Sequence, residues 1–402
     1  MIPDLNAIPD PDHTHKSRPF LLMEGGPLYR IEQRIGLVHT NALLTKRRAL
    51  AAVCLTWLPL LVFTLLQGTA FAGVKIPFLH DFSAYSRFLV CIPLLLLIEL
   101  VVEPRIAEAA EQFLLSGIVT PKDYKQFDAA VEDGLRLRDS VIAEIVIAIL
   151  SYSFTFMTYR TLAVHTATWY STARPDSSYG LTGAGWWQLL ICVPLMQFLI
   201  LRWIWRIFLW FRFLKRVSNF DLKLFGTHPD AAGGLGFVGE AQRFFGLTFF
   251  AYSCGITGVL ANEVFYGGIQ LQHLAPAIVA YAISCLLFAA LPLMVFTPKL
   301  LATKRQSLHQ YGALATVYTG SFQRRWIKGD NPGHEMLLGS ADIQSLADLG
   351  NSFQIIQDMK PLPVAPKDLI KLIVMSLLPM ASLLLTVMSP KELIQMLMKV
   401  MV

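Results

Sequence analysis

Four charged residues lie inside hydrophobic stretches of this sequence and are the strongest candidates for functional chemistry. The two acidic residues are Glu99 and Glu144, and the two basic residues are Arg202 and Arg206. An ionised side chain inside a lipid bilayer costs about 2.5–3.5 kcal/mol on insertion scales, so it normally has a partner or a water-filled cavity. We interpret the four residues either as an ion or proton pathway or as a buried ion-pair network that fixes the helix register.

The hydrophobic stretches around these charges predict the fold class. Of the 402 residues, 54% are hydrophobic and 15% are charged, whereas soluble domains carry about 25% charged residues. We therefore predict an all-α, polytopic transmembrane helical bundle, in which prolines such as Pro93 and Pro194 mark kinked helices. A spanning helix needs roughly 20 apolar residues, and seven segments meet or approach this length: about 50–72, 87–103, 141–160, 187–211, 244–263, 274–297 and 369–388.

The distribution of Lys and Arg predicts the orientation of this bundle. The N-terminal 49 residues and the three loops on the same side carry 25 of these residues, whereas the other side carries six. Cytoplasmic loops are enriched in Lys and Arg, so the N-terminus is expected in the cytoplasm. The sequence leaves open whether the seventh segment crosses fully. The predicted parts are a cytoplasmic arm (1–49), a six-span core (50–298) with a helical loop (104–140) and a Gly-rich loop (212–243), a cytoplasmic helical segment (299–368), and a seventh span with an interfacial C-terminal helix (369–402).

The Gly-rich loop contains the sequence GTHPDAAGGLGFVGE at residues 226–240. Gly234 and Gly236 begin a formal GxGxxG match, but the dinucleotide fingerprint follows a strand in a βαβ unit. Here a membrane helix precedes it, so we expect the glycines to permit tight turns or close packing. Their backbone N–H groups would also be free to bind an anion at the start of the next helix. A lipid phosphate is a suitable ligand, because three basic residues of the loop lie before this glycine sequence: Arg212, Lys215 and Arg216.

Two residues of the same loop, His228 and Asp230, are able to titrate. They would form the centre of the site if the protein were a membrane enzyme acting on lipid, although such residues more often cap a turn. The sequence contains no HExxH, P-loop or nucleophile-elbow motif, so we predict no catalytic residue, metal site or cofactor. His13 and His15 have the spacing of a metal pair, and we interpret them as part of a flexible tail.

Two of the predicted spans carry a stripe of small and polar residues on one face. Such a stripe marks either helix–helix contact or a polar path, and contact is the more common. The stripe of the third span comprises Glu144, Ala148, Ser151, Thr155 and Thr158, and that of the fifth comprises Thr248, Ala251, Gly255, Gly258 and Asn262.

The loop sequence HPDAAGGLGF, the segment GSADIQSLADLGNSFQIIQDMKPLP and the last hydrophobic stretch together resemble a family of uncharacterised bacterial multi-pass membrane proteins. The resemblance covers about the second half of the chain. It implies location in a bacterial inner membrane and carries no activity. Within this half, apolar residues at helical spacing predict an amphipathic helix over 341–358.

These observations favour a small-solute or ion transporter or a channel-like protein, with the four intramembrane charges as its polar centre. The alternative is a non-catalytic membrane scaffold or regulatory protein that binds a partner through cytoplasmic helices 105–138 and 341–358. The expected partners are the lipid bilayer and anionic lipid headgroups, and homo-oligomer formation is left open. The net charge of +6 reflects membrane topology, so nucleic-acid binding is not predicted.

Overall fold

A computed structural model describes residues 15, 17–36, 42–162, 168–173, 179–328 and 341–386. Within these ranges, seven helices are long and apolar enough to cross a membrane, which confirms the predicted helical membrane bundle. The predicted C-terminal interfacial helix lies outside the described residues, as does His13. The spans are Thr45–Leu66, Phe82–Leu115, Val141–Tyr159, Gly183–Val217, Gly236–Phe265, Leu271–Met294 and Pro366–Thr386.

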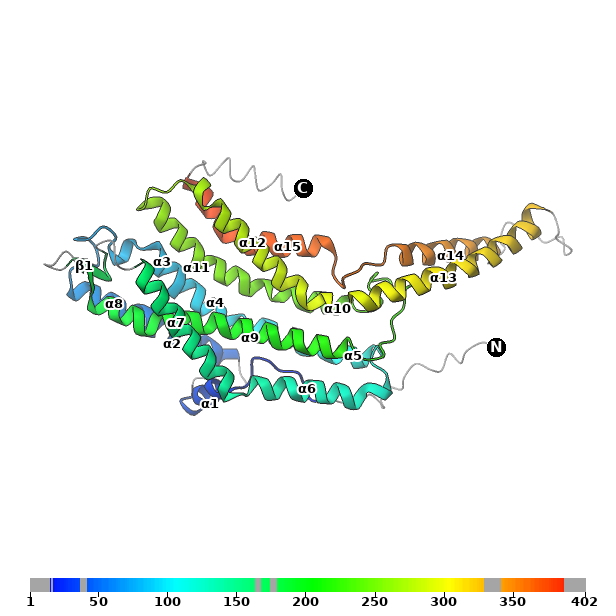
Figure 1. Ribbon diagram of the computed structural model, residues 1–402, viewed down its shortest axis with the longest axis horizontal. Helices are drawn as coiled ribbons and strands as arrows, with labels where there is room; N and C mark the ends of the chain where they lie inside the picture. The colour runs from blue at the N-terminus through cyan, green and yellow to red at the C-terminus, as the bar shows by residue number, and fades with distance from the viewer. Residues whose placement is uncertain are drawn as a thin grey trace.

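The helices run along the long axis of the molecule, and the connections gather at its two ends (Figure 1). One end carries α6 (Tyr124–Arg138), α13 (Thr297–Phe322) and α14 (Ala341–Gln357). We call it the basic end, and it is the end expected to face the cytoplasm. The opposite, outer end carries an antiparallel pair of short strands, β1 (Ser171–Ala173) and β2 (Tyr179–Leu181).

The second and fourth spans are much longer than a bilayer requires. They contain 34 and 35 residues, or about 50 Å of helix, against a hydrocarbon layer of about 30 Å. The expected bounds 87–103 and 187–211 are too short, because charged residues end the hydrophobic stretch while the helix continues. The second span consists of α3 (Phe82–Ala84), η3 (Tyr85–Cys91), α4 (Ile92–Leu97) and α5 (Glu99–Leu115), and the fourth of α8 (Gly183–Trp187), η5 (Gln188–Cys192) and α9 (Val193–Val217).

Both long spans contain a π-helical turn directly before a proline. The π-helical segment η3 precedes Pro93 at the start of α4, and η5 precedes Pro194 at the start of α9. Proline lacks an N–H group and its ring crowds the carbonyl of the preceding turn. A wider turn relieves this crowding, so the two helices pass the proline without ending.

The remaining elements complete the bundle and its connections. α1 and α2 precede the second span, and α10, α11, α12 and α15 belong to the last three spans. Their bounds are α1 (Pro27–Arg34), α2 (Ala42–Leu66), η2 (Phe78–His80), η4 (Pro121–Asp123), α7 (Val141–Leu162), α10 (Gly236–Phe244), α11 (Gly246–Phe265), α12 (Leu271–Met294), η6 (Gln323–Ile327), α15 (Pro366–Leu377) and η7 (Leu378–Thr386).

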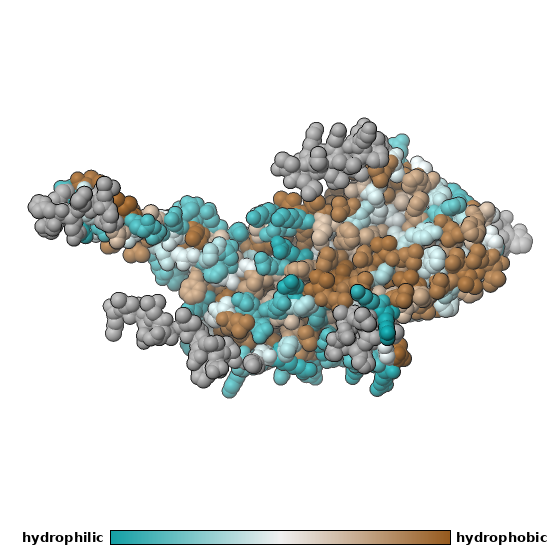
Figure 2. Space-filling model, turned by 180° about the vertical axis from the view of Figure 1, so that it is seen from behind, coloured by the Kyte–Doolittle hydropathy of each residue, from teal (hydrophilic) through white to brown (hydrophobic). Residues whose placement is uncertain are grey.

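The most densely packed aromatic core lies at the basic end, between α5, α6 and α9. Phe213 is in ring contact with Phe20, Phe127 and Trp210, with centroids 4.4–5.6 Å apart. Apolar side chains cover the half of the molecule that contains the spans, and polar side chains dominate the other half (Figure 2). This division is what a lipid belt around one half of the molecule requires.

Both stripes of small and polar residues are helix contacts. On α7, the Ser151 hydroxyl donates to the carbonyl of Pro194 on α9 at 2.6 Å, and Thr155 bonds the Gln197 side chain. On α11, Gly258 packs directly against α3 and η3, and a Cβ there would lie 2.6 Å from the carbonyl oxygen of Phe82. The stripes therefore hold neighbouring spans together.

We predict that Gly258→Ala lowers the free energy of unfolding by about 1–3 kcal/mol, because the new methyl group overlaps Ser86 and the Phe82 carbonyl. Gly255→Ala is the matched control on the same helix. A Cβ at Gly255 would lie 3.5 Å from Cys91, an ordinary contact. Thermal unfolding in detergent distinguishes the two variants, and equal unfolding temperatures would contradict the packing argument.

Candidate functional site

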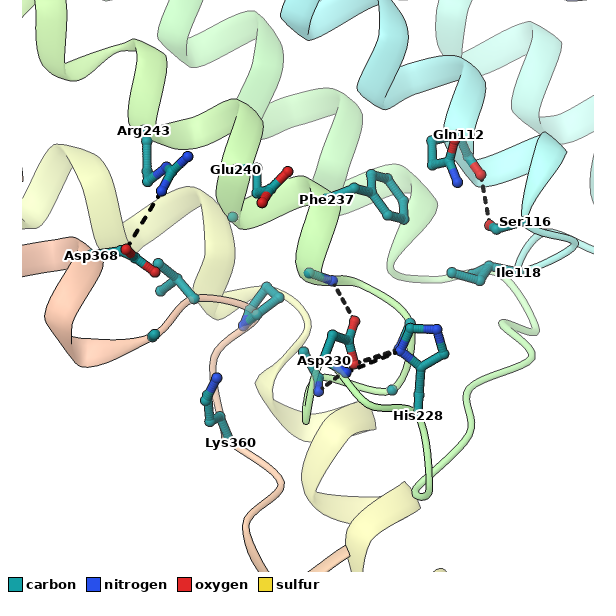
Figure 3. A pocket seen from close by; sticks show the side chains of 18 of the residues that line it. Gln112, Ser116, Ile118, His228, Asp230, Phe237, Glu240, Arg243, Lys360 and Asp368 are labelled. Atoms are coloured by element: carbon teal, nitrogen blue, oxygen red, sulfur yellow. Dashed lines mark hydrogen bonds and ion pairs between the residues drawn. The ribbon is translucent and has the colours of Figure 1, made fainter. Parts of the chain in front are cut away.

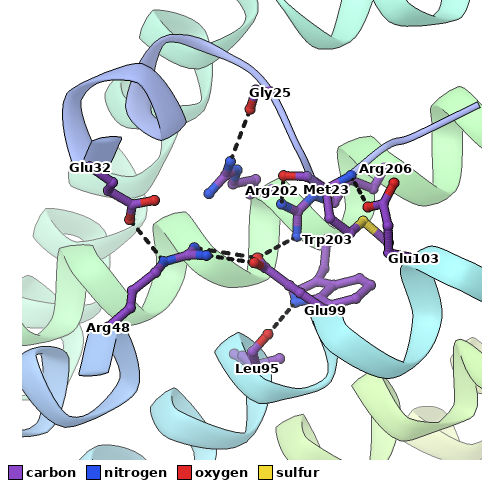
Figure 4. A network of polar contacts seen from close by, with 10 residues as sticks. All are labelled: Met23, Gly25, Glu32, Arg48, Leu95, Glu99, Glu103, Arg202, Trp203 and Arg206. Atoms are coloured by element: carbon purple, nitrogen blue, oxygen red, sulfur yellow. Dashed lines mark hydrogen bonds and ion pairs between the residues drawn. The ribbon is translucent and has the colours of Figure 1, made fainter. Parts of the chain in front are cut away.

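Glu99 lies at the centre of a buried network of charges that joins three spans (Figure 4). Its carboxylate accepts a hydrogen bond from Arg48 of α2 at 2.6 Å and from Arg206 of α9 at 2.7 Å. Arg48 also contacts the Glu32 carboxylate of α1 at 2.9 Å. We call Glu32, Arg48, Glu99, Glu103, Arg202 and Arg206 the charge cluster.

The charge cluster is closed to solvent at its centre. The side chains of Arg48, Glu99 and Arg206 are all buried, and Arg206 is 2% exposed. The Arg206 guanidinium also lies over the ring of Trp203, 5.1 Å from its centroid, which stabilises a desolvated cation. Arg48 and Arg206 share the single carboxylate of Glu99. These three residues therefore carry an excess positive charge, which only an ionised Glu32 or Glu103 can balance.

Arg202 is the least satisfied member of the cluster. It is 5% exposed, its Nη2 donates to the carbonyl of Gly25 at the long distance of 3.5 Å, and its Nη1 has no partner within the described residues. No carboxylate forms a direct ion pair with Arg202 in the described parts of the chain, and Glu99 and Glu32 act on its charge through space. A buried guanidinium in this position is costly.

Glu144 does not join the other three predicted residues. It is half-buried at the start of α7, and its carboxylate accepts the backbone N–H of Leu28 at 2.8 Å. Its role is therefore to hold the first turn of α1, where a carboxylate is favourable with the helix dipole. The structure brings Glu99 and Arg206 into contact, places Arg202 beside them, and assigns Glu144 to the N-terminal segment.

The N-terminal residues 17–26 form a strap that crosses the charge cluster at the basic end. Phe20, Leu22 and Met23 are buried. The backbone of the strap is bound by charged side chains of the helices: Glu103 accepts the N–H of Met23, and Arg206 donates to its carbonyl at 3.5 Å. The strap therefore supplies backbone hydrogen-bond partners to charged side chains of the cluster, and its own buried peptide groups are satisfied in return.

The interpretation of His15 as part of a flexible tail is wrong. Its Nε2 lies 2.7 Å from an Asp128 carboxylate oxygen of α6, and its ring stacks on Tyr124. The physical reason is the apolar sequence PFLLM at 19–23, which anchors the strap in the aromatic core. This short hydrophobic stretch was the feature of the sequence from which a buried N-terminal segment could have been predicted.

Three members of the charge cluster were not predicted: Glu32, Arg48 and Glu103. Arg48 belongs to a basic run that was counted only as a topology signal. The sequence offered little further signal: all three of Arg48, Thr56 and Thr64 are buried, but their eight-residue spacing rotates each by about 80° from the one before, so they do not form one helix face. Burial also raises the pKa of Glu32, although the neighbouring Arg48 opposes that shift.

The Gly-rich loop is organised around Asp230. Its carboxylate accepts the backbone N–H groups of Ala232 and Gly236 at 2.8 Å and that of Gly234 at 3.2 Å. His228 Nδ1 lies 2.8 Å from the same carboxylate. The glycine amides expected to be free for an external anion are thus occupied by the protein's own carboxylate. Burial favours a higher pKa for Asp230, but these hydrogen bonds outweigh it and lower the pKa.

The glycines of the loop serve turns and packing. Gly234 has a φ of 97°, which favours glycine. Gly239 packs so closely on the carbonyl of Pro363 that any Cβ would overlap it. We call residues 359–366 the return segment, since they lead from α14 to α15. The residues of the GxGxxG match therefore form part of the surface on which the return segment packs, and no dinucleotide site is indicated.

A cavity of about 540 Å³ lies between this loop, the end of α5 and the return segment (Figure 3). We call it the basal cavity. His228, Asp230, Gly234 and Gly236 all line it. The three basic residues expected near the loop lie elsewhere: Arg212 and Arg216 pair with Asp133 of α6 at 2.6 and 3.3 Å, and Lys215 is exposed.

No family model matches the chain, and no curated protein or solved structure is significantly similar to it. The seven apolar helices identify an integral membrane protein. The arrangement of its charges offers two sites of different character, a closed ion-pair cluster inside the bundle and an open polar cavity at the basic end.

We predict that Glu99→Gln lowers the free energy of unfolding by about 3–5 kcal/mol, since it leaves two buried arginines without a shared counterion. The matched control is Glu108→Gln on the same helix, which breaks the exposed ion pair with Arg105 and should cost less than about 1 kcal/mol. Thermal unfolding in detergent measures both variants. Similar losses in the two would show that the Glu99 pairs contribute no more than surface pairs.

We predict that acid loosens the Gly-rich loop through Asp230. Because the folded-state pKa of Asp230 is depressed, its contribution to stability is complete above the ordinary value of 3.8 and is lost as the pH falls through the lower folded value. Hydrogen exchange at the backbone amides of Gly234 and Gly236, corrected for intrinsic rates, should accelerate only when the pH falls to the depressed pKa of Asp230. Asp230→Asn should exchange fast at every pH, and a persistent acid transition in that variant would assign the effect to another group.

Proposed function

We propose that this protein is a non-catalytic membrane scaffold that binds a cytoplasmic protein partner through the hairpin of α13 and α14. The two helices contact one another and project from the bundle along its long axis (Figure 1). α13 alone has 26 residues, or about 39 Å of helix. This hairpin, here called the arm, is the observation that carries the proposal.

The arm buries few of its residues and leaves several apolar side chains exposed. In α13 the buried residues are Leu300 and Ser307, and in α14 the buried residue is Ile356. Toward the far end of the arm, Leu314, Val317 and Ile343 are 52%, 69% and 43% exposed. Contiguous exposed apolar side chains commonly mark protein interaction sites.

The charge of the arm indicates the character of the partner. α13 carries Lys299, Lys304 and Arg305, and η6 adds Arg324 and Arg325. α14 contributes Asp342, which pairs with Arg325 at 3.4 Å, and Asp348, so basic residues remain in excess. A partner with an apolar helix face flanked by acidic residues matches this surface. The resemblance noted above and the Lys and Arg asymmetry support a bacterial inner membrane with the arm in the cytoplasm.

The charge cluster supports a scaffold over a transporter. An ion or proton pathway needs ionisable groups that water can reach. Glu99 and Arg206 are instead buried and bonded to one another, and the strap covers them. Their arrangement suits a network that fixes the positions of α2, α5 and α9.

We predict that the double variant Leu314→Asp/Val317→Asp loses its partner without losing stability. Purification of the full-length protein in mild detergent should yield one stoichiometric partner with the wild type, and at least about tenfold less with the variant, because two carboxylates would be placed in an apolar contact. Thr316→Asp is the control, since Thr316 is exposed on the same helix and changes the charge without removing an apolar side chain.

The opposite result has two parts. If no partner co-purifies, and if reconstituted vesicles show solute or ion flux that Glu144→Gln abolishes, the protein is a small-solute or ion transporter and the scaffold proposal fails.

A further inference from the structure

The basal cavity has the dimensions and the lining of a ligand site. Its volume of about 540 Å³ falls within the range of about 300–1,000 Å³ that is usual for small-molecule pockets. Four segments converge on it: the end of α5, the Gly-rich loop, α10 and the residues around the start of α15 (Figure 3). Neither the charge cluster nor the proposed partner surface of the arm includes this cavity.

Not all of the charged side chains that line the cavity pair with one another. Asp230 is saturated by three backbone amides and His228. Arg243 and Asp368 pair with each other at 3.5 Å. Lys360, Lys367 and Glu240 remain, and none of their charged groups has a hydrogen bond or ion pair within the described ranges. The three basic and three acidic side chains of the lining sum to zero charge, but two lysine ammonium groups and one carboxylate are left without a partner in the part of the chain that the structure describes.

Two ammonium groups without a partner suit an anionic phosphate group, and the zero sum of the lining charges favours an anion of low charge. A phosphodiester carries one negative charge, whereas a phosphomonoester carries about 1.5 to 2 near neutral pH. Lysine ammonium groups bind phosphate oxygens through charge-assisted hydrogen bonds. The backbone of Lys360 is fixed at the cavity, because its N–H donates to the carbonyl of Ala231 at 2.8 Å.

The cavity also lies at the level where lipid phosphates occur. The seventh span, Pro366–Thr386, has 21 residues, close to the length that crosses the hydrocarbon layer. Lys367 is its second residue, and the apolar Ile370, one turn further, is 61% exposed, as is expected of a position that faces lipid. Basic pockets between spans on the cytoplasmic side bind anionic headgroups.

From these two unpartnered lysines and the volume and depth of the cavity, we propose that the basal cavity binds a phosphodiester through Lys360 and Lys367, with the headgroup of an anionic phospholipid as its source. Glu240, exposed at the rim, excludes more highly charged anions by repulsion. The proposal is independent of the partner that the arm binds.

The test is a titration of the full-length protein in neutral detergent with short-chain phosphatidylglycerol. The wild type should bind saturably, and Lys360→Met and Lys367→Met should each weaken binding about tenfold, because each removes one charge-assisted hydrogen bond. Lys371→Met is the matched control on α15. Lys371 is an exposed lysine near Asp368 that does not line the cavity, and its removal should leave binding unchanged.

Competition identifies the source of the phosphate. If glycerol 3-phosphate and inorganic phosphate fail to displace the short-chain lipid, the site is for a lipid headgroup; if glycerol 3-phosphate displaces it and binds as tightly, the phosphate site stands but its source is soluble. Unchanged binding in the Lys360→Met/Lys367→Met double variant, or an equal loss in Lys371→Met, overturns the proposal. Equal unfolding temperatures of all variants exclude misfolding as the cause of a loss.

Discussion

The Glu99 carboxylate is the interaction on which the rest of the structure depends. It receives Arg48 from α2 and Arg206 from α9, and it belongs to α5, so one residue fixes three spans at the same depth. Ion pairs of this kind contribute little net stability relative to a well-packed apolar core, but they strongly disfavour any arrangement that separates the partners. The strap then adds peptide groups to the arginines, and Glu144 holds α1 beside it. The polar groups thus specify one arrangement of the helices. Lipid-facing apolar side chains alone would not distinguish this arrangement from others.

The molecule uses different forces at its two ends. Where the spans meet within the lipid belt, apolar burial provides no preference for helix contact over lipid, so close packing at Gly258 and hydrogen bonds such as Ser151 to Pro194 hold the helices. At the basic end the helices extend beyond the hydrocarbon and are surrounded by water. There the hydrophobic effect acts fully, and the aromatic cluster around Phe213 forms. The charge cluster lies between these two regions.

Much of the fold could be predicted from the sequence, because length and hydropathy determine a membrane span almost alone. All seven spans were located in this way. Their extensions were not, because α5 and α9 continue past the residue types that end a hydrophobic stretch. The candidate site was predicted in part. Glu99 and Arg206 do meet. Arg48 was missed because its neighbour Arg47 is also an arginine, and the two differ only in the direction in which each points from the helix.

The Gly-rich loop illustrates a second limit of the sequence. Its turns and its exposed backbone amides follow from the glycines. That Asp230 would occupy those amides depends on a reversal of the chain over four to six residues, which composition does not reveal. The return segment is similar, since Gly239 was recognisable as a site of close approach but Pro363, more than a hundred residues away, was not recognisable as its neighbour.

The strap has a consequence for the way this protein is made. Met23 bonds to Arg206, a residue 183 positions later in the chain. At a synthesis rate of about 5–20 residues per second, roughly 10–40 seconds pass before that partner emerges from the ribosome. The contact between the strap and Arg206 stays open throughout this interval, although Glu103, the other partner of Met23, has already been synthesised. All partners of the strap are present only after the fourth span has been inserted. Binding of the strap therefore follows insertion of the first four spans and completes the first half of the protein.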